Sequence, residues 1–163
     1  TPDIMTLSKA LTGGTLPLAA TVVAREVFAA FWSERSEDAL MHGPTYMGNA
    51  LACAAANASL DLFEREGRVE QARSMESELE AGLAPLRKVA GVRDVRCLGA
   101  IGVVQLEEAG DLEALKARFI QEGVWVRPFR DIVYVTPALN IDEADLHTLL
   151  VAVERGVREH LKH

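Results

Sequence analysis

The clearest apolar periodicity lies in the second half of the chain. Between about residues 69 and 86, apolar side chains recur every three or four positions with glutamates between them, which is typical of an amphipathic helix. Two apolar runs follow at residues 92–98 and 100–106, and they predict two strands that meet at Gly99. The apolar positions of the helix are Met75, Leu79, Leu83 and Leu86.

Two acidic residues mark the starts of the remaining helices. Asp111 and Asp142 are good N-caps, and they predict helices over about residues 111–122 and 142–161. Between these helices, the runs 124–128 and 132–135 predict a hairpin. This alternation of helices and short strands predicts a compact α+β unit.

The first 66 residues follow a different pattern. Residues 3–7 and 18–24 predict short strands on either side of a Gly-Gly turn, and residues 25–31 predict a short helix. After the break at Gly43-Pro44, Thr45 is expected to cap a helix that runs to about Glu66. The middle of this helix is small and apolar all round, so we expect it to be covered by a segment outside this sequence or by a partner subunit.

The change of pattern near residue 66 predicts two parts. Residues 1–66 read as a piece of a larger layered α/β structure, and residues 67–163 read as a small α+β domain.

Composition narrows the classes of function. The 163 residues carry a net charge of −7, and the lysines and arginines form no cluster, so we expect no nucleic-acid partner. No apolar run approaches the roughly 18 residues that a membrane span needs, and the first residues do not resemble a secretory signal. Cys53 and Cys97 lie far apart in apolar surroundings, so we expect two reduced thiols in a cytoplasmic protein.

Three places carry candidate chemistry. Lys9 lies between an apolar run and a glycine turn, where a lysine can become a nucleophilic amine, although a solvated loop lysine fits the same spacing. Gly43-Pro44-Thr45 at a helix start can bind phosphate or be a plain cap. Arg127 can bind a carboxylate through two parallel hydrogen bonds, or it can pair with Asp131 or with solvent. The sequence indicates no metal site.

Several segments together resemble the class III (subgroup II) pyridoxal-phosphate aminotransferases. Residues 8–14 (SKALTGG) resemble the lysine motif of that family, and residues 42–49 (HGPTYMGN) resemble its phosphate-binding turn. Residues 98–104 and 123–129 resemble segments of its C-terminal domain. The resemblance implies the C-terminal part of a fold-type I transferase, with residues 1–66 in the large cofactor-binding domain and residues 67–163 as the small domain.

The resemblance also implies roles for single residues. Lys9 matches the lysine that forms a Schiff base with pyridoxal 5'-phosphate and then carries a proton. Pro44 and Thr45 match the turn that binds the cofactor phosphate in the neighbouring subunit of a homodimer. Gly43 matches a substrate-contacting position, and Arg127 matches the arginine that binds a substrate carboxylate.

Within the family, these segments are most similar to those of the aminotransferases of biotin biosynthesis. These members transfer the amino group of S-adenosylmethionine to 8-amino-7-oxononanoate. Other class III ω-aminotransferases, which act on ornithine, aminobutyrate or similar amines, are the alternative, and a non-catalytic packing or dimerisation fragment is a second. Because the family's other cofactor-binding residues precede the lysine, we expect this chain to be a fragment that is inactive alone.

Overall fold

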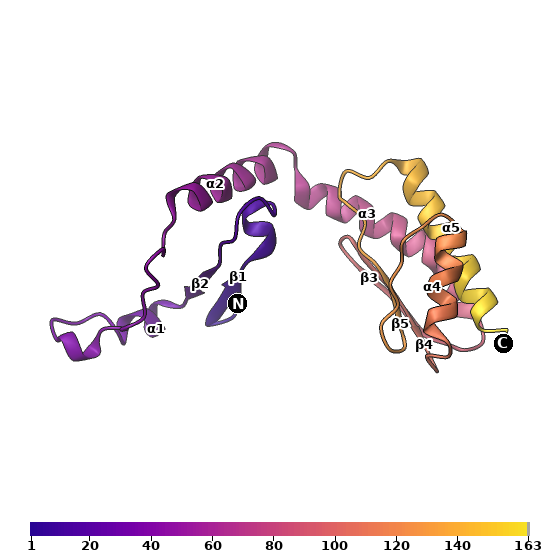
Figure 1. Cartoon of the computed structure of the whole chain (residues 1–163), viewed down its shortest axis with the longest axis horizontal. Helices are drawn as coiled ribbons and strands as arrows, with labels where there is room; N and C mark the ends of the chain where they lie inside the picture. The colour runs from indigo at the N-terminus through magenta and orange to yellow at the C-terminus, as the bar shows by residue number, and fades with distance from the viewer. Residues whose placement is uncertain (163) are drawn as a thin grey trace. The chain divides into compact units, whose positions relative to one another are not determined.

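The computed structural model describes residues 1–162 and divides the chain into two compact units, Thr1–Glu66 and Gly67–His163. Each unit is described by itself (Figure 1). The division falls where the sequence pattern changes. The assignment of the two units to a large and a small domain stays a prediction.

The second unit is built on a three-stranded antiparallel sheet in the order β3-β4-β5. The strands are β3 (Val92–Leu98), β4 (Ile101–Leu106) and β5 (Ile132–Val135). The register pairs Leu98 with Ile101 across the β3–β4 turn and Gln105 with Ile132 across β4–β5. Both strands expected from residues 92–106 are therefore confirmed to within one residue.

Three helices cover one face of this sheet (Figure 1). They are α3 (Arg68–Leu83), which continues into the 3-10 turn η3 (Ala84–Lys88), α4 (Leu112–Gln121) and α5 (Glu143–His160). Alternate strand residues point into the core, among them Val95, Val104 and Val133, each at most 3% exposed. The opposite face mixes polar side chains such as Asp94, Arg96 and Gln105 with apolar ones such as Leu98 and Ile101, which are 75% and 48% exposed.

The predicted caps of the last two helices are confirmed. Asp111 Oδ1 accepts hydrogen bonds from the amides of Glu113 and Ala114 at 3.1 and 3.0 Å. Asp142 Oδ1 accepts one from the amide of Ala144 at 2.9 Å. Such caps satisfy backbone donors that have no partner inside the helix.

The predicted hairpin at residues 124–135 is only partly correct. Phe129 and Ile132 exchange two backbone hydrogen bonds of 2.8 and 3.0 Å around a tight turn. Residues 124–128, however, are extended without forming a strand. Pro128 lacks an amide donor, so the ladder cannot extend through it from the turn.

The first unit contains a two-stranded antiparallel sheet and one long helix. The strands are β1 (Ile4–Leu7) and β2 (Ala20–Val23), followed by α1 (Arg25–Ala29), the 3-10 turn η2 (Ser36–Asp38) and α2 (Ala50–Arg65). Only Thr12, Ala52 and Ala56 are buried in this unit. Leu51, at 74% exposure, shows how open the apolar helix α2 is. No helix among residues 1–162 is both long enough and apolar enough to cross a membrane.

The expectation that Thr45 caps the long helix is wrong. Thr45 lies in a turn, and the helix begins at Ala50 with Asn49 as its cap. Gly48 adopts a φ of 68°, a left-handed conformation that interrupts the helical path. The side-chain oxygen of Asn49 then accepts a 3.0 Å hydrogen bond from the amide of Ala52. The argument from a helix N-terminus at Thr45 therefore does not apply.

The packing of α4 on α5 generates a prediction about Gly156. A Cβ placed there would lie 2.9 Å from Cδ1 of Phe119 and closer still to its Cε1. Phe119 is fully buried and cannot move aside. Overpacking of this kind costs about 1–3 kcal/mol, which exceeds the 0.5–1 kcal/mol that alanine gains over glycine in a helix. We therefore expect Gly156→Ala to lower the free energy of unfolding by about 1–2 kcal/mol in chemical denaturation.

Thr148→Ala is the matched control on the same helix. Thr148 is exposed, and its hydroxyl bonds only the carbonyl of Ala144. A surface change of this kind stays within about 0.5 kcal/mol. Equal stability of the two variants would contradict the close packing of α4 against α5.

Candidate active site

Lys9 lies two residues after the end of β1 and adopts an unusual backbone conformation. Its φ is 51°, in the left-handed region that residues other than glycine rarely adopt. Such a conformation costs about 1–2 kcal/mol, and residues that keep it are enriched at functional sites. The side chain is exposed, lines a hollow with residues 14–19, and forms no hydrogen bond or ion pair within residues 1–162. Its amine therefore has no partner within residues 1–162, but β1 and Lys9 are exposed, so the loss of solvation that would make the amine nucleophilic is not seen here.

The loop that follows Lys9 is closed by threonine side chains. The hydroxyl of Thr12, which is only 2% exposed, donates a 2.5 Å hydrogen bond to the carbonyl of Leu16. The carbonyl of Thr12 in turn accepts bonds from the hydroxyl and the amide of Thr15, at 2.8 and 3.2 Å. These bonds fix the turn that forms one wall of the hollow beside Lys9.

A contact with α2 holds the short 3-10 helix η1 (Lys9–Thr12) in place. Ser59 Oγ donates a 3.3 Å hydrogen bond to the carbonyl of Ala10, the residue after Lys9. On the other side, Ser8 Oγ donates a 3.3 Å bond to the carbonyl of Leu18. The residues on either side of Lys9 are therefore bonded to the segment before β2 and to the second half of α2.

Gly43, Pro44 and Thr45 lie before the other end of α2. All three are exposed, and the amide of Met47 closes the turn on the carbonyl of Pro44 at 2.9 Å. The amide and hydroxyl of Thr45 donate no hydrogen bond within residues 1–162. Two donors of one residue thus face outward, an arrangement that suits an anion such as phosphate.

The first unit does not bring Lys9 and Thr45 together through α2. Ser59, which contacts the lysine turn, is ten positions after the helix cap Asn49, and this spacing corresponds to about 15 Å along a helix. The two elements therefore meet α2 at well-separated points.

Arg127 lies in the second unit, on the extended segment before the β5 hairpin turn. It is exposed and lines two hollows of about 570 and 300 Å³, both of which also include Tyr134. Its guanidinium forms no hydrogen bond or ion pair within residues 1–162. The alternative in which Arg127 pairs with Asp131 is therefore wrong, because other residues occupy that carboxylate.

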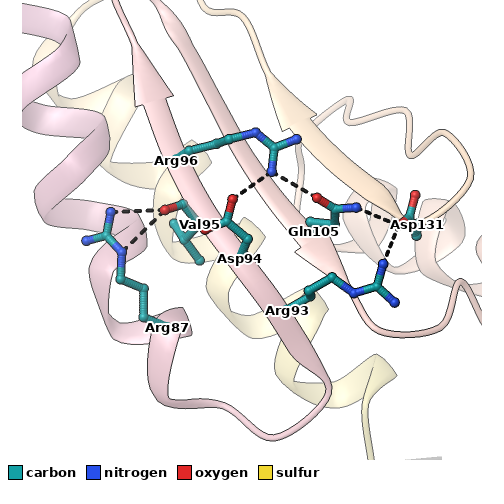
Figure 2. Close-up of polar contacts among 7 residues, drawn as sticks. All are labelled: Arg87, Arg93, Asp94, Val95, Arg96, Gln105 and Asp131. Carbon is teal, nitrogen blue, oxygen red and sulfur yellow. Dashed lines mark hydrogen bonds and ion pairs between the residues drawn. The ribbon is translucent and has the colours of Figure 1, made fainter.

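A chain of polar contacts crosses the exposed face of the sheet (Figure 2). Arg96 Nη1 donates to Asp94 at 2.9 Å and to Gln105 Oε1 at 3.0 Å. Gln105 Nε2 then donates to Asp131 Oδ2 at 2.8 Å, and Arg93 lies 3.8 Å from the same carboxylate oxygen. The hydrogen bond from Gln105 is the main cause that lowers the pKa of the Asp131 carboxyl, and desolvation acts against it.

A family profile described as Aminotransferase class-III matches residues 1–157. The chain belongs to the class III aminotransferases. The adenosylmethionine-8-amino-7-oxononanoate aminotransferase of Corynebacterium glutamicum is 46% identical over 136 residues, which cover 83% of this chain and 32% of that protein. The enzyme of the same name from Buchnera aphidicola subsp. Schizaphis graminum is 42% identical over 96% of this chain and 36% of its own length.

Solved structures confirm the expected fold of this class III aminotransferase chain. The adenosylmethionine-8-amino-7-oxononanoate aminotransferase of Methanocaldococcus jannaschii matches 98% of this chain and 39% of its own with a TM-score of 0.84 and 32% identity. The omega transaminase of Pseudomonas jessenii in complex with PMP matches 99% of this chain and 38% of its own, with a TM-score of 0.85 and 28% identity. The chain spans about a third of the length of the curated relatives it matches.

Sequence reasoning missed two polar residues that lie near the candidate site residues. The buried hydroxyl of Thr12 had a signal, because a threonine directly before Gly13-Gly14 often closes a turn. Gln105 had a different signal, because it is a single polar residue inside an apolar strand.

Both cysteines are free and partly buried, and burial is the main cause that raises the pKa of the Cys97 thiol. No cluster suited to a metal ion occurs among residues 1–162.

The closed loop beside Lys9 generates a prediction about Thr12. Thr12→Val keeps the shape of the side chain but removes the hydroxyl that donates to the carbonyl of Leu16. We expect about 0.5–1.5 kcal/mol less protection of amides 13–18, measured by hydrogen exchange with mass spectrometry. Thr15→Val is the control, because the carbonyl of Thr12 keeps its second donor, the amide of Thr15. Equal protection in both variants would contradict this account.

Proposed function

We propose that the whole protein containing this chain transfers an amino group from S-adenosylmethionine to 8-amino-7-oxononanoate. The observation that carries the proposal is the exposed, unpartnered amine of Lys9, held on a left-handed backbone beside a hollow. The membership of the chain in the class III aminotransferases supports a role for this amine in transamination.

The donor set of the first unit suits pyridoxal phosphate. Lys9 would hold its aldehyde carbon covalently through Nζ, and Thr45 would bind its phosphate through the amide and hydroxyl that lack partners. Pro44 fixes the backbone before Thr45. When bound, pyridoxal phosphate accepts the electron pair released as a C–H bond of the substrate breaks.

The spacing along α2 supports a site shared between two copies of the protein. Lys9 and Thr45 meet α2 about ten residues apart, so one cofactor is more easily held by Lys9 of one copy and Thr45 of the other. The exposed apolar residues of α2, such as Leu51, Leu60 and Phe63, also need a cover. We therefore propose a homodimer.

The chain's own residues then have three tasks. Lys9 Nζ, once the substrate amine has displaced it from the cofactor, would carry a proton between the substrate carbon that bears nitrogen and the cofactor's aldehyde carbon. Arg127 orients the substrate by binding its carboxylate with two parallel hydrogen bonds. Gly43 has no neighbour within 4 Å of a built Cβ, so its open surface suits a substrate contact.

Sequence identity favours the biotin-pathway reaction over other transaminations. Structural likeness does not separate them, since TM-scores are 0.84 for the Methanocaldococcus jannaschii enzyme and 0.85 for the Pseudomonas jessenii omega transaminase. Identity supports the biotin-pathway reaction, at 46% and 42% for the two curated relatives and 32% for the Methanocaldococcus jannaschii enzyme, against 28% for the omega transaminase.

The role of Lys9 is tested by a covalent adduct. The whole protein is incubated with pyridoxal phosphate, reduced with borohydride and mapped by peptide mass. We expect one adduct per chain at Lys9, and we expect Lys9→Ala to lose both the adduct and transamination, because no other amine occupies this position.

Lys88→Ala is the control for this experiment. Lys88 is an exposed lysine of η3 in the other unit, so its removal should leave the adduct at Lys9 intact. A full adduct or full turnover in Lys9→Ala would refute the assignment.

The role of Arg127 is tested by kinetics of the whole protein. Loss of a charge-assisted pair of hydrogen bonds removes about 1.5–3 kcal/mol, so Arg127→Ala should raise KM for 8-amino-7-oxononanoate about 10- to 150-fold. Arg127→Lys keeps the charge without the planar fork and should recover only part of the loss. An unchanged KM in Arg127→Ala would show that this guanidinium does not bind substrate.

A further inference from the structure

We propose that Gln105 is a positioning residue, whose side-chain amide ties Asp131 to β4 and thereby sets the backbone position of Arg127. The inference rests on the proposed function, because it assumes that Arg127 binds the substrate carboxylate.

The segment that carries Arg127 has few backbone restraints of its own. Residues 124–128 form no strand, although Val126 and Pro128 on either side of Arg127 are buried, and the backbone first pairs with β5 at the bridge between Phe129 and Ile132. Arg130, inside this turn, has a φ of 53°, which is strained for a residue other than glycine. Strain persists only when neighbouring contacts hold the backbone in place.

Asp131 supplies those contacts. Its carbonyl accepts a 2.7 Å hydrogen bond from the amide of Leu106 at the end of β4. Its carboxylate accepts the 2.8 Å bond from Gln105, which directly precedes Leu106. The main chain and the side chain of Asp131 are therefore bonded to two adjacent residues of β4. Asp131 lies four residues after Arg127.

Gln105 suits this task because its amide both donates and accepts. Its oxygen accepts from the guanidinium of Arg96, and its nitrogen donates to the carboxylate of Asp131 (Figure 2). A carboxylate at this position could accept from Arg96 but would repel Asp131, and an apolar side chain could do neither. Gln105 thus lies between a positive group, Arg96, and a negative one, Asp131. A side-chain amide suits this position because it can accept from the first and donate to the second.

Gln105 also lies on the same side of the sheet as the larger hollow beside Arg127. Its neighbours Val104 and Leu106 point into the core, so Gln105 and Val103 point to the opposite face. Val103 lines that hollow together with Arg127 and Tyr134. A substitution of Gln105 is therefore expected to affect the side of the sheet that lines this hollow with Arg127, and not the hydrophobic core.

The experiment uses Gln105→Glu in the whole protein, with 8-amino-7-oxononanoate as the varied substrate. This change preserves size and the bond from Arg96 but sets two carboxylates against each other. We expect KM to rise about three- to tenfold, the range of one lost hydrogen bond. We expect kcat to stay within about twofold and the pyridoxal phosphate adduct at Lys9 to stay complete, since a merely structural defect would lower the amount of active protein instead.

A double-mutant cycle tests whether Gln105 acts through Arg127. In an Arg127→Ala background, Gln105→Glu should raise KM no further. Arg87→Leu is the matched control, because Arg87 binds the carbonyl of Val95 from the other side of β3 and should leave KM unchanged. If Gln105→Glu fails to fold, Asp131→Asn tests the same tether by the same criteria, because it weakens the bond from Gln105 without a change of size.

The outcomes separate this inference from the proposed function. An unchanged KM in Gln105→Glu, or an equal rise in the Arg127→Ala background, overturns the role of Gln105 while Arg127 keeps its own. A rise in KM for Arg87→Leu equal to that for Gln105→Glu also overturns it, since general loosening of the sheet would then suffice. An unchanged KM in Arg127→Ala overturns both.

Discussion

The spacing along α2 is the constraint on which the first unit depends. The hydrogen bond from Ser59 to Ala10 fastens the lysine turn to the second half of this helix, and the Gly43–Thr45 turn precedes its first residue. A helix is stiff over this length, so the two turns are held apart by a fixed rise per residue. This separation, together with the exposed apolar surface of α2, is what supports the proposed site shared between two chains.

In the second unit, the two faces of the sheet differ in what they contact, and the proposed role of Arg127 lies on the exposed side. The covered face packs apolar side chains against α3, α4 and α5, so substitutions there act on folding. The exposed face carries charged and amide side chains whose hydrogen bonds run from β3 to the turn before β5 (Figure 2). Arg127 lies beside this face with a free guanidinium, because Asp131 is already held by Gln105 and Arg93. The network therefore leaves the guanidinium of Arg127 available for a carboxylate.

Prediction succeeded where the chemistry is local. The caps at Asp111 and Asp142 and the strands around Gly99 follow from short patterns, and the structure contains all of them. The start of α2 was misplaced because Thr45 and Asn49 are both good caps, and only the left-handed φ of Gly48 decides between them. The segment at 124–128 was misplaced because strand composition does not reveal whether a partner strand is within reach.

The sequence by itself determined the order of the helices and most strands, the change of pattern at residue 66, and the motif in which Lys9 lies. These follow from periodicity, capping and turn chemistry, which act over a few residues. Only the tertiary structure decided the left-handed backbone of Lys9, the freedom of Arg127 and the link from Gln105 to Asp131. Each depends on a contact between residues distant along the chain, and the hydrogen-bond partner of a side chain is fixed only when the fold brings the two together.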